Sequence, residues 1–111
     1  MNQGDIFSVD LEPISGHEQG GHRPVMLITL AAFNKINIPF AVPITTKGQS
    51  FIQKGFAVSL EGCSKTAGFV LCNQIRALDL NARHARYVET APLEIVEKVI
   101  QKILTFIVEP N

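Results

Sequence analysis

The 111-residue sequence contains no tryptophan, one tyrosine and two cysteines, and its hydrophobic stretches are all short. The longest of them, such as residues 25–28 and 69–72, fall far below the roughly 20 residues that a membrane-spanning helix needs. The N-terminus has neither the basic segment nor the long apolar segment of a secretory signal. We therefore expect a cytoplasmic protein that makes no membrane contact.

The scarcity of cysteine also argues against a disulfide framework or a zinc centre. Cys63 and Cys72 lack the paired spacing of zinc ligands, and Cys72 lies in an apolar stretch where a buried thiol is common. The three histidines, at positions 17, 22 and 84, are scattered along the chain. We therefore expect neither a metal site nor any other cofactor.

The formal net charge is zero, which argues against a protein that coats duplex DNA by bulk electrostatics. The charge is nevertheless uneven along the chain. Residues 1–21 carry a net charge of −4, residues 22–88 carry +6, and residues 89–111 carry −2. This pattern is compatible both with random scatter over a solvated surface and with a local groove for nucleic acid.

Length and composition predict one domain that spans residues 1–111 and is mainly β. Residues 6–11 alternate between apolar and polar side chains, as in a half-buried strand, and residues 24–30 form an apolar run typical of a strand buried on both faces. Further strands are expected at residues 40–44, 56–60 and 69–74. Closely spaced short strands of this kind form a small barrel or sandwich, here over about residues 4–88.

The periodicity changes after Pro92, where a helix of about four turns is expected over residues 92–108. Thr90 can cap this helix, and Pro110 lies just beyond its end. One face of the helix is predicted to carry Leu93, Val96, Ile100, Ile103, Leu104 and Ile107. Further apolar side chains at Ile95, Val99 and Phe106 widen the stripe, which indicates either a second packing partner or a wider contact within the monomer.

The segment of residues 15–24 combines glycines with a high density of ionisable groups. It contains His17, Glu18, His22 and Arg23, and it leads directly into an expected buried strand. One interpretation is a long flexible hairpin without a function of its own. The other is a site for phosphoryl chemistry, because a guanidinium matches two phosphate oxygens and a carboxylate can accept a proton from a hydroxyl.

Three motifs follow one another along the chain. They are Gly4-Asp5-Ile6 with Val9, Pro13, Gly16, Glu18-Gln19 and Gly21-His22-Arg23-Pro24; Val42-Pro43-Ile44-Thr45-Thr46; and Val70-Leu71-Cys72-Asn73-Gln74-Ile75-Arg76-Ala77-Leu78-Asp79. Together they resemble the MazF/PemK (Kid) family of bacterial type II toxin-antitoxin toxins, and residues 16–19, 32–34 and 73–76 are most similar to its ChpB branch. The resemblance runs from about Gly4 through the C-terminal helix.

The resemblance implies a small SH3-like β-barrel with a C-terminal helix, which forms a homodimer. It also implies a metal-independent, ribosome-independent endoribonuclease that cuts single-stranded mRNA at specific sequences and thereby arrests translation and growth. Arg23 and Thr45 match the family's catalytic Arg and Thr, and Glu18 matches a loop carboxylate linked to activity in some members. These residues suit RNA, because RNA supplies its own nucleophile, the ribose 2′-OH, and the protein needs only to remove its proton and stabilise the phosphate. The expected products are a 2′,3′-cyclic phosphate and a 5′-OH.

The chain departs from the family pattern in the third motif. Kid-like members carry an Arg and an Asp proposed as catalytic where this chain has Leu71 and Asn73. An amide is not a base at neutral pH, so Glu18 is the expected base, with His22 as the alternative, and Asn73 is either a substrate contact or a structural amide. Polar residues expected to contact phosphates or base edges are His22, Asn34, Thr46, Lys47, Asn73, Gln74 and Arg76.

The resemblance also implies a protein partner. An antitoxin with a flexible acidic segment is expected to fold over the RNA groove, and to bring the toxin indirectly to operator DNA. Two alternatives differ in function: a noncatalytic inhibitor of a protein target such as DNA gyrase, as in the related CcdB toxins, and a member that binds RNA without cutting it. In the CcdB toxins, gyrase inhibition relies on a Trp near the C-terminus, and this chain contains no Trp. Retention of Glu18, Arg23 and Thr45 argues against the second.

Overall fold

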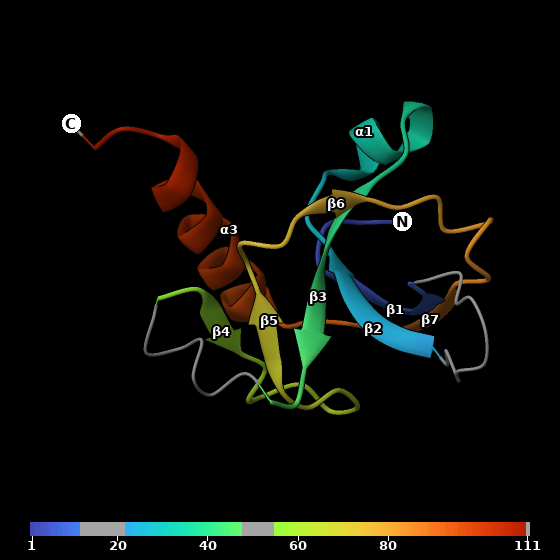
Figure 1. Cartoon of the computed structure of the whole chain (residues 1–111), viewed down its shortest axis with the longest axis horizontal. Helices are drawn as coiled ribbons and strands as arrows, with labels where there is room; N and C mark the ends of the chain where they lie inside the picture. The colour runs from blue at the N-terminus through green and yellow to red at the C-terminus, as the bar shows by residue number, and fades with distance from the viewer. Residues whose placement is uncertain (12–21, 48–54, 111) are drawn as a thin grey trace.

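The fold is described here from a computed structural model, and the description covers residues 1–11, 22–47 and 55–110. In chain order the elements are β1 (Asp5–Asp10), β2 (His22–Leu27), α1 (Ala31–Ile36), β3 (Phe40–Thr45), β4 (Ala57–Ser59), β5 (Phe69–Leu71), β6 (Arg76–Ala77), β7 (Arg86–Thr90) and α3 (Leu93–Ile107) (Figure 1). A mainly β fold with a C-terminal helix, as the sequence predicts, is confirmed. None of the described helices is long and apolar enough to cross a membrane.

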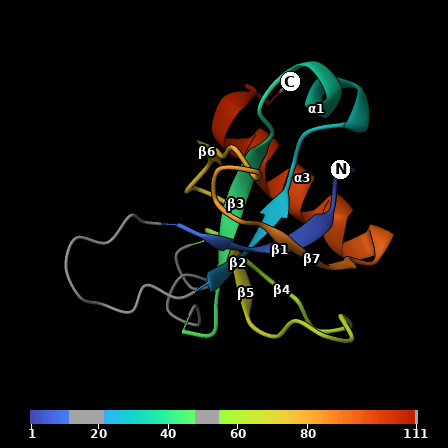
Figure 2. The ribbon, with the colours of Figure 1, turned by 90° about the vertical axis from the view of Figure 1, so that its right-hand side faces the viewer.

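The strands form one strongly curved antiparallel sheet in the order β4-β5-β3-β2-β1-β7. The long central strand β3 pairs with β2 along one edge, and its other edge pairs with β5 at one end and with β6 at the other. Figure 2 shows the strands curling around one another while α3 lies across one side of them. The curling gives the small barrel that the sequence predicts.

Alternation along the strands divides the apolar side chains between two cores. One core lies between the sheet and α3, and its main members are Ile6, Met26, Val42, Ile44, Ile95, Val96, Val99 and Ile103. The other lies on the opposite face of the sheet and contains Phe7, Val9, Val25, Leu27, Ala41, Leu78 and Leu80. Each fully buried aliphatic side chain of this size stabilises the fold by about 1.5–3 kcal/mol.

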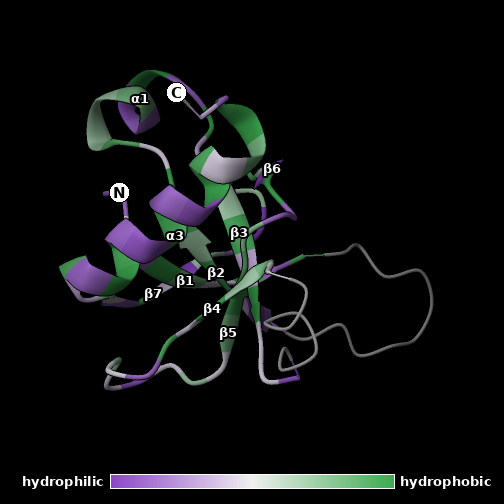
Figure 3. Ribbon diagram, turned by 90° about the vertical axis from the view of Figure 1, so that its left-hand side faces the viewer, coloured by the Kyte–Doolittle hydropathy of each residue, from purple (hydrophilic) through white to green (hydrophobic). Residues whose placement is uncertain are grey.

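The face of α3 that packs on the sheet differs from the one expected. Its buried residues are Ile95, Val96, Val99 and Ile103, whereas Leu93 and Ile107 are 70% and 68% exposed. Figure 3 shows the polar face of the helix turned away from the strands, and a hydrophobic C-terminal end. The prediction is right for Val96 and Ile103, which are buried, and for Ile100, which packs against the core, but the buried face is rotated toward Ile95 and Val99. The apolar stripe of α3 is wider than its contact with the sheet, so periodicity alone does not select which edge of the stripe is buried.

Other elements also differ from expectation. The strand expected at residues 24–30 is β2, His22–Leu27, and its first two residues are exposed. Thr90 does not cap α3, which starts after Pro92 without a side-chain cap. The Thr90 hydroxyl instead donates a hydrogen bond to Asp5 Oδ1 at 2.7 Å, so it ties the end of β7 to the start of β1.

A buried carboxylate fixes the connection between β4 and β5. Glu89 of β7 is 9% exposed, and it accepts hydrogen bonds from the backbone N–H groups of Ser64 and Lys65 and from the hydroxyls of Ser64 and Thr66. Burial alone raises the pKa of Glu89, but the bonds from Thr66, Lys65 and Ser64 outweigh it and hold the pKa below its usual range. Glu89 is therefore ionised when the protein is folded at neutral pH.

Replacing Glu89 by Gln is expected to destabilise the fold by about 2 kcal/mol at pH 7, because the amide turns a donor toward groups that need an acceptor. A carboxyl whose folded pKa is depressed stabilises the fold above its unfolded pKa, near 4.3, and loses this contribution as the pH falls further. The deficit of Glu89→Gln, measured by urea unfolding, should therefore shrink between pH 7 and pH 3. The exposed Glu97→Gln is the control, and an unchanged deficit at pH 3 contradicts the assignment.

Candidate active site

The two catalytic candidates that the structure describes lie at the same end of neighbouring strands. Arg23 is near the start of β2 and Thr45 is the last residue of β3. The β2–β3 ladder ends at the pair Val25↔Pro43, and each candidate lies two residues beyond it. Strand alternation therefore places Arg23 and Thr45 on the same face of the sheet as Val25, which is the face opposite α3.

Arg23 stands at the margin of the core on that face. It pairs with Val9 of β1, which is fully buried, while Arg23 itself is exposed. No hydrogen bond or ion pair joins its guanidinium to another residue within the described ranges. Within the described structure, all its donors are therefore available to an anionic ligand such as a phosphate.

Thr45 has its hydroxyl oriented by the backbone that follows it. The N–H of Lys47 donates to Thr45 Oγ1 at 3.0 Å, and among the described residues the hydroxyl proton has no acceptor, so it can donate to a ligand. Gly68 packs against the Thr45 carbonyl so closely that a Cβ atom there would clash, and its φ of +115° is also unfavourable for other residues. Sequence reasoning missed Gly68; the only signal was a glycine directly before a short strand.

The third motif runs along β3 from one end to the other: Val70 pairs with Ile44, next to Thr45, and Arg76 and Ala77 pair with Ala41 and Phe40 at the far end. Thr45 pairs with Phe69 at the start of β5, whereas Arg76 pairs with Ala41. Four residues of strand separate the two pairs, or about 13 Å. Asn73, Gln74 and Arg76 are all exposed, and the pairing of Arg76 with Ala41 separates Arg76 from Arg23 and Thr45 within one chain.

Asn34, expected to read a base edge, has its side chain fully engaged within the protein. Its Nδ2 donates to the carbonyl oxygens of Met1 and Thr29, both at 3.0 Å, and its Oδ1 accepts from Thr29 Oγ1 at 2.5 Å. The Thr29 hydroxyl also accepts the N–H of Phe40. The geometry favours a structural brace between α1 and β3 over the expected base contact.

Two of the histidines that are scattered in the sequence meet in space on Asp10. His22 Nε2 lies 3.4 Å from Asp10 Oδ1, and His84 Nδ1 lies 3.3 Å from Asp10 Oδ2. They meet because the β1–β2 ladder pairs Asp10 with His22, and a bond from the Asp10 N–H to the Arg83 carbonyl holds the next turn alongside. His22 Nδ1 is also 3.2 Å from the Ser8 carbonyl, so both ring nitrogens can donate only when the imidazole is protonated.

Arg83, which sequence reasoning did not single out, holds the end of β1. Its Nη1 donates to the carbonyl oxygens of Asp10 and Leu11 at 2.8 and 2.5 Å. These are the last described residues before the segment that contains Glu18. His17 and Glu18 themselves lie outside the described residues, so the proposed base is not placed.

The remaining reactive groups of the described residues show no catalytic arrangement. Both cysteines are free, and burial raises the pKa of the Cys72 thiol to about 11, so this thiol is neutral and belongs to the core. No group of three or more His, Cys, Asp or Glu side chains is arranged for metal binding within the described ranges. Leu71 of the third motif is 6% exposed, so its side chain is buried in the barrel and carries no reactive group to the surface.

Comparison with known proteins agrees with this fold and these motifs. Residues 2–107 match the family described as PemK-like, MazF-like toxin of type II toxin-antitoxin system. The chain is 41% identical to the endoribonuclease PemK of Escherichia coli over 96% of its own length and 82% of the relative's. It is 38% identical to the endoribonuclease toxin ChpB of Escherichia coli K12, covering 93% of this chain and 90% of that toxin.

A solved structure shares the architecture. The MazE–MazF crystal structure from Deinococcus radiodurans superimposes with a TM-score of 0.83 at 29% identity, over 96% of this chain and 94% of that one. Fold, motifs and relatives together define a small β-barrel toxin of the endoribonuclease class. The chain belongs to the PemK-like, MazF-like family of type II toxin-antitoxin toxins.

Proposed function

We propose that this toxin cuts single-stranded mRNA at specific sequences, without a metal ion and without the ribosome, in the cytoplasm. The observation that carries the proposal is the placement of Arg23 and Thr45 at one end of β2 and β3, on the same face of the sheet. A guanidinium and a hydroxyl donor in that position suit the two non-bridging oxygens of one phosphate. RNA then supplies the nucleophile itself through its 2′-OH.

The division of roles follows from the chemistry of each side chain. Arg23 stabilises the charge of the pentacoordinate phosphorane, and Thr45 donates a hydrogen bond on the phosphate side. Glu18 removes the 2′-OH proton, with His22 as the alternative base. Attack by the 2′ oxygen on phosphorus breaks the bond to the 5′ oxygen, which takes a proton from water as it leaves, so the products are a 2′,3′-cyclic phosphate and a 5′-OH.

We assign the remaining RNA contacts to exposed polar residues near the two ends of β3. Thr46 and Lys47 follow Thr45 directly and hold the neighbouring phosphate, while Asn73, Gln74 and Arg76 bind nucleotides further along the strand. The distance along β3 between these groups is too great for one phosphate but matches roughly two nucleotides of extended RNA. Message cleavage of this kind arrests translation and growth.

A homodimer accounts for the exposed apolar surface. Beyond the core, the C-terminal end of α3 and the turn before β6 present large apolar side chains to solvent, namely Ile75, Leu104, Phe106, Ile107 and Val108, which are 38–68% exposed. Gln74 and Arg76 flank Ile75, so joining two copies there brings the third motif of each chain to a groove shared by both. Sedimentation equilibrium at micromolar concentration should give twice the 12.2 kDa chain mass, and a monomer contradicts this arrangement.

We further propose that an antitoxin neutralises the toxin. Its flexible acidic segment covers the RNA groove and displaces the Glu18 segment, and the same partner links the toxin to operator DNA. The support is the net charge of +6 over residues 22–88, which attracts an acidic chain as it attracts RNA.

Mapping the cut ends of one long RNA by primer extension tests the proposed function. Purified protein should cut at a limited set of sites that share a short sequence, and the new ends should carry a 5′-OH. Excess EDTA should leave the pattern and the rate unchanged. Loss of cleavage in EDTA, or cleavage at every accessible nucleotide, would contradict the proposal.

A further inference from the structure

Arg23 lies on a part of β2 that one neighbouring strand supports. The β2–β3 ladder stops two residues short of Arg23, so within the described residues this end of β2 pairs only with β1. The last pairs of the β1–β2 ladder are Val9↔Arg23 and Asp10↔His22. The position of the Arg23 backbone therefore depends on what holds the end of β1.

The turn before β7 holds that end. The Asp10 N–H donates to the Arg83 carbonyl at 3.0 Å, and Arg83 Nη1 donates to the Asp10 carbonyl at 2.8 Å. His84, which follows, has a φ of +52° and is the one non-glycine residue in the described part of the chain with a positive φ. Histidine is among the residues that tolerate this left-handed region, and strained backbone of this kind clusters at functional sites.

The Asp10 carboxylate joins this turn to β2. Its Oδ2 lies 3.3 Å from His84 Nδ1, and its Oδ1 lies 3.4 Å from His22 Nε2. The side chains of Asp10 and His22 are 42% and 30% exposed, so water only partly screens this contact. Because His22 directly precedes Arg23, the carboxylate fixes the residue on which the direction of Arg23 depends.

His22 itself points away from the face that carries Arg23. Successive residues of a strand face opposite sides of the sheet, and Arg23 shares the face of its partner Val9. Both nitrogens of the His22 ring also lie beside oxygen atoms, Nδ1 at 3.2 Å from the Ser8 carbonyl and Nε2 beside Asp10. His22 therefore presents no free nitrogen to a substrate on the Arg23 face, and its contribution passes through the strand.

We propose that Asp10 is a positioning residue for RNA cleavage: held by His84 and Arg83, its carboxylate fixes His22 and keeps Arg23 directed at the scissile phosphate. The inference rests on the proposed cleavage of RNA by Arg23. It also decides between the two candidate bases, because His22 held in this way does not remove the 2′-OH proton. Misplacing a catalytic group by about 1 Å lowers a rate by up to about 100-fold, so an indirect contact of this kind has a measurable effect.

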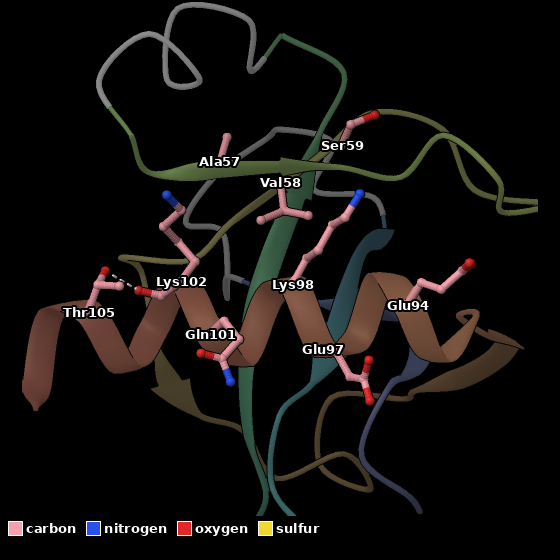
Figure 4. Close-up of a pocket in the computed structure, with 9 residues that line it drawn as sticks. All are labelled: Ala57, Val58, Ser59, Glu94, Glu97, Lys98, Gln101, Lys102 and Thr105. Atoms are coloured by element: carbon pink, nitrogen blue, oxygen red, sulfur yellow. Dashed lines mark hydrogen bonds between the residues drawn. The ribbon is translucent and has the colours of Figure 1, made fainter.

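The first test measures kcat and KM with a short fluorogenic RNA that contains the mapped cleavage sequence. Asp10→Ala should lower kcat about tenfold and leave KM within about twofold, because alignment in the transition state is lost while binding is kept. Glu97→Ala is the control, since Glu97 is an exposed carboxylate of α3 that extends away from β4 (Figure 4). A wild-type kcat for Asp10→Ala overturns the inference alone. If the wild type cuts no RNA, the proposed function fails and the inference fails with it.

Variants of His84 test the same contact without disturbing a buried residue, because the His84 side chain is 78% exposed. Asn and Gly both tolerate the left-handed backbone at this position. His84→Asn keeps an N–H donor at the place of Nδ1 and should retain nearly the wild-type kcat, whereas His84→Gly has no donor and should lower kcat about threefold or more. Equal rates for the two variants overturn the role of the contact.

A double-mutant cycle shows whether Asp10 acts through Arg23. In the Arg23→Ala background, Asp10→Ala should lower the remaining rate less than about twofold, because no guanidinium is left to align. A general loss of folded protein, or a separate contact with RNA, would lower the rate about tenfold in both backgrounds, and that result overturns the positioning role.

The pH dependence of the rate separates positioning from proton transfer. His22→Gln keeps an N–H donor at the place of Nε2 but has no basic nitrogen. Its rate should be lower than that of the wild type at every pH, with the same decline on the acid side of the profile. If that decline disappears in His22→Gln, His22 moves the proton itself and the proposal is wrong.

Discussion

Arg23→Ala is expected to lower the rate of RNA cleavage by a factor of about 100 to 1,000 while leaving the fold intact. The loss is large because a guanidinium directed at the phosphorane stabilises charge that develops only in the transition state. The fold is spared because Arg23 is exposed at the start of β2, beyond the pairs that hold β2 to β3. The rate is measured with a short fluorogenic RNA that contains the mapped cleavage sequence.

Arg86→Ala is the matched control. Arg86 is also an exposed arginine in the sheet, but it pairs with Ser8, whose side chain points to the face opposite Val9 and Arg23. This variant should cleave at the wild-type rate. Both variants should unfold within about 4 °C of the wild type, because exposed substitutions change stability by at most about 0.5 kcal/mol. Wild-type cleavage by Arg23→Ala refutes the catalytic role, and a strongly lowered thermal midpoint makes Arg23 structural.

The sequence predicts those elements whose own residues show a clear order of apolar and polar side chains. Alternation over residues 6–11 identifies β1, the short apolar run at residues 40–44 identifies β3, and the change of period after Pro92 identifies α3. β7 escaped prediction because Arg86–Thr90 has no apolar run or clear alternation of apolar and polar residues, and pairing with β1 makes it a strand. The short helix α1 escaped because no side chain caps it and none of its residues is buried, so neither signal of a helix is present.

In the candidate site, too, the sequence identifies individual residues, whereas their arrangement depends on the pairing of strands far apart in the chain. The motifs identify Arg23 and Thr45, but only the antiparallel register of β2 and β3 shows that they share an end and a face. The sequence gives no reason to separate these residues from Asn73 and Arg76; the separation follows from β3 pairing with β5 at one end and β6 at the other. Contacts such as His84 with Asp10 cross most of the chain and carry no local signal.

An RNA with a single 2′-deoxy sugar immediately 5′ of the scissile phosphate is expected to bind normally and remain uncut. The nucleophile in the proposed mechanism is the 2′-OH of that nucleotide, and no side chain replaces it once it is removed. The phosphate contacts proposed for Arg23, Thr45 and Lys47 do not involve this hydroxyl, so the affinity for RNA should change little and should still fall steeply with salt. Binding is measured by anisotropy, and cleavage by gel electrophoresis over long incubation.

Moving the deoxy sugar one nucleotide to the 3′ side provides the control. That substrate keeps the attacking hydroxyl and carries the same number of 2′-OH groups, so it should be cut at nearly the rate of the all-RNA substrate. The contrast between the two positions separates loss of the nucleophile from loss of a binding contact. Cleavage of the first substrate at a comparable rate would mean that water or a side chain attacks the phosphate, and the roles proposed for Glu18 and Arg23 would then have to be abandoned, because both are built on attack from within the substrate.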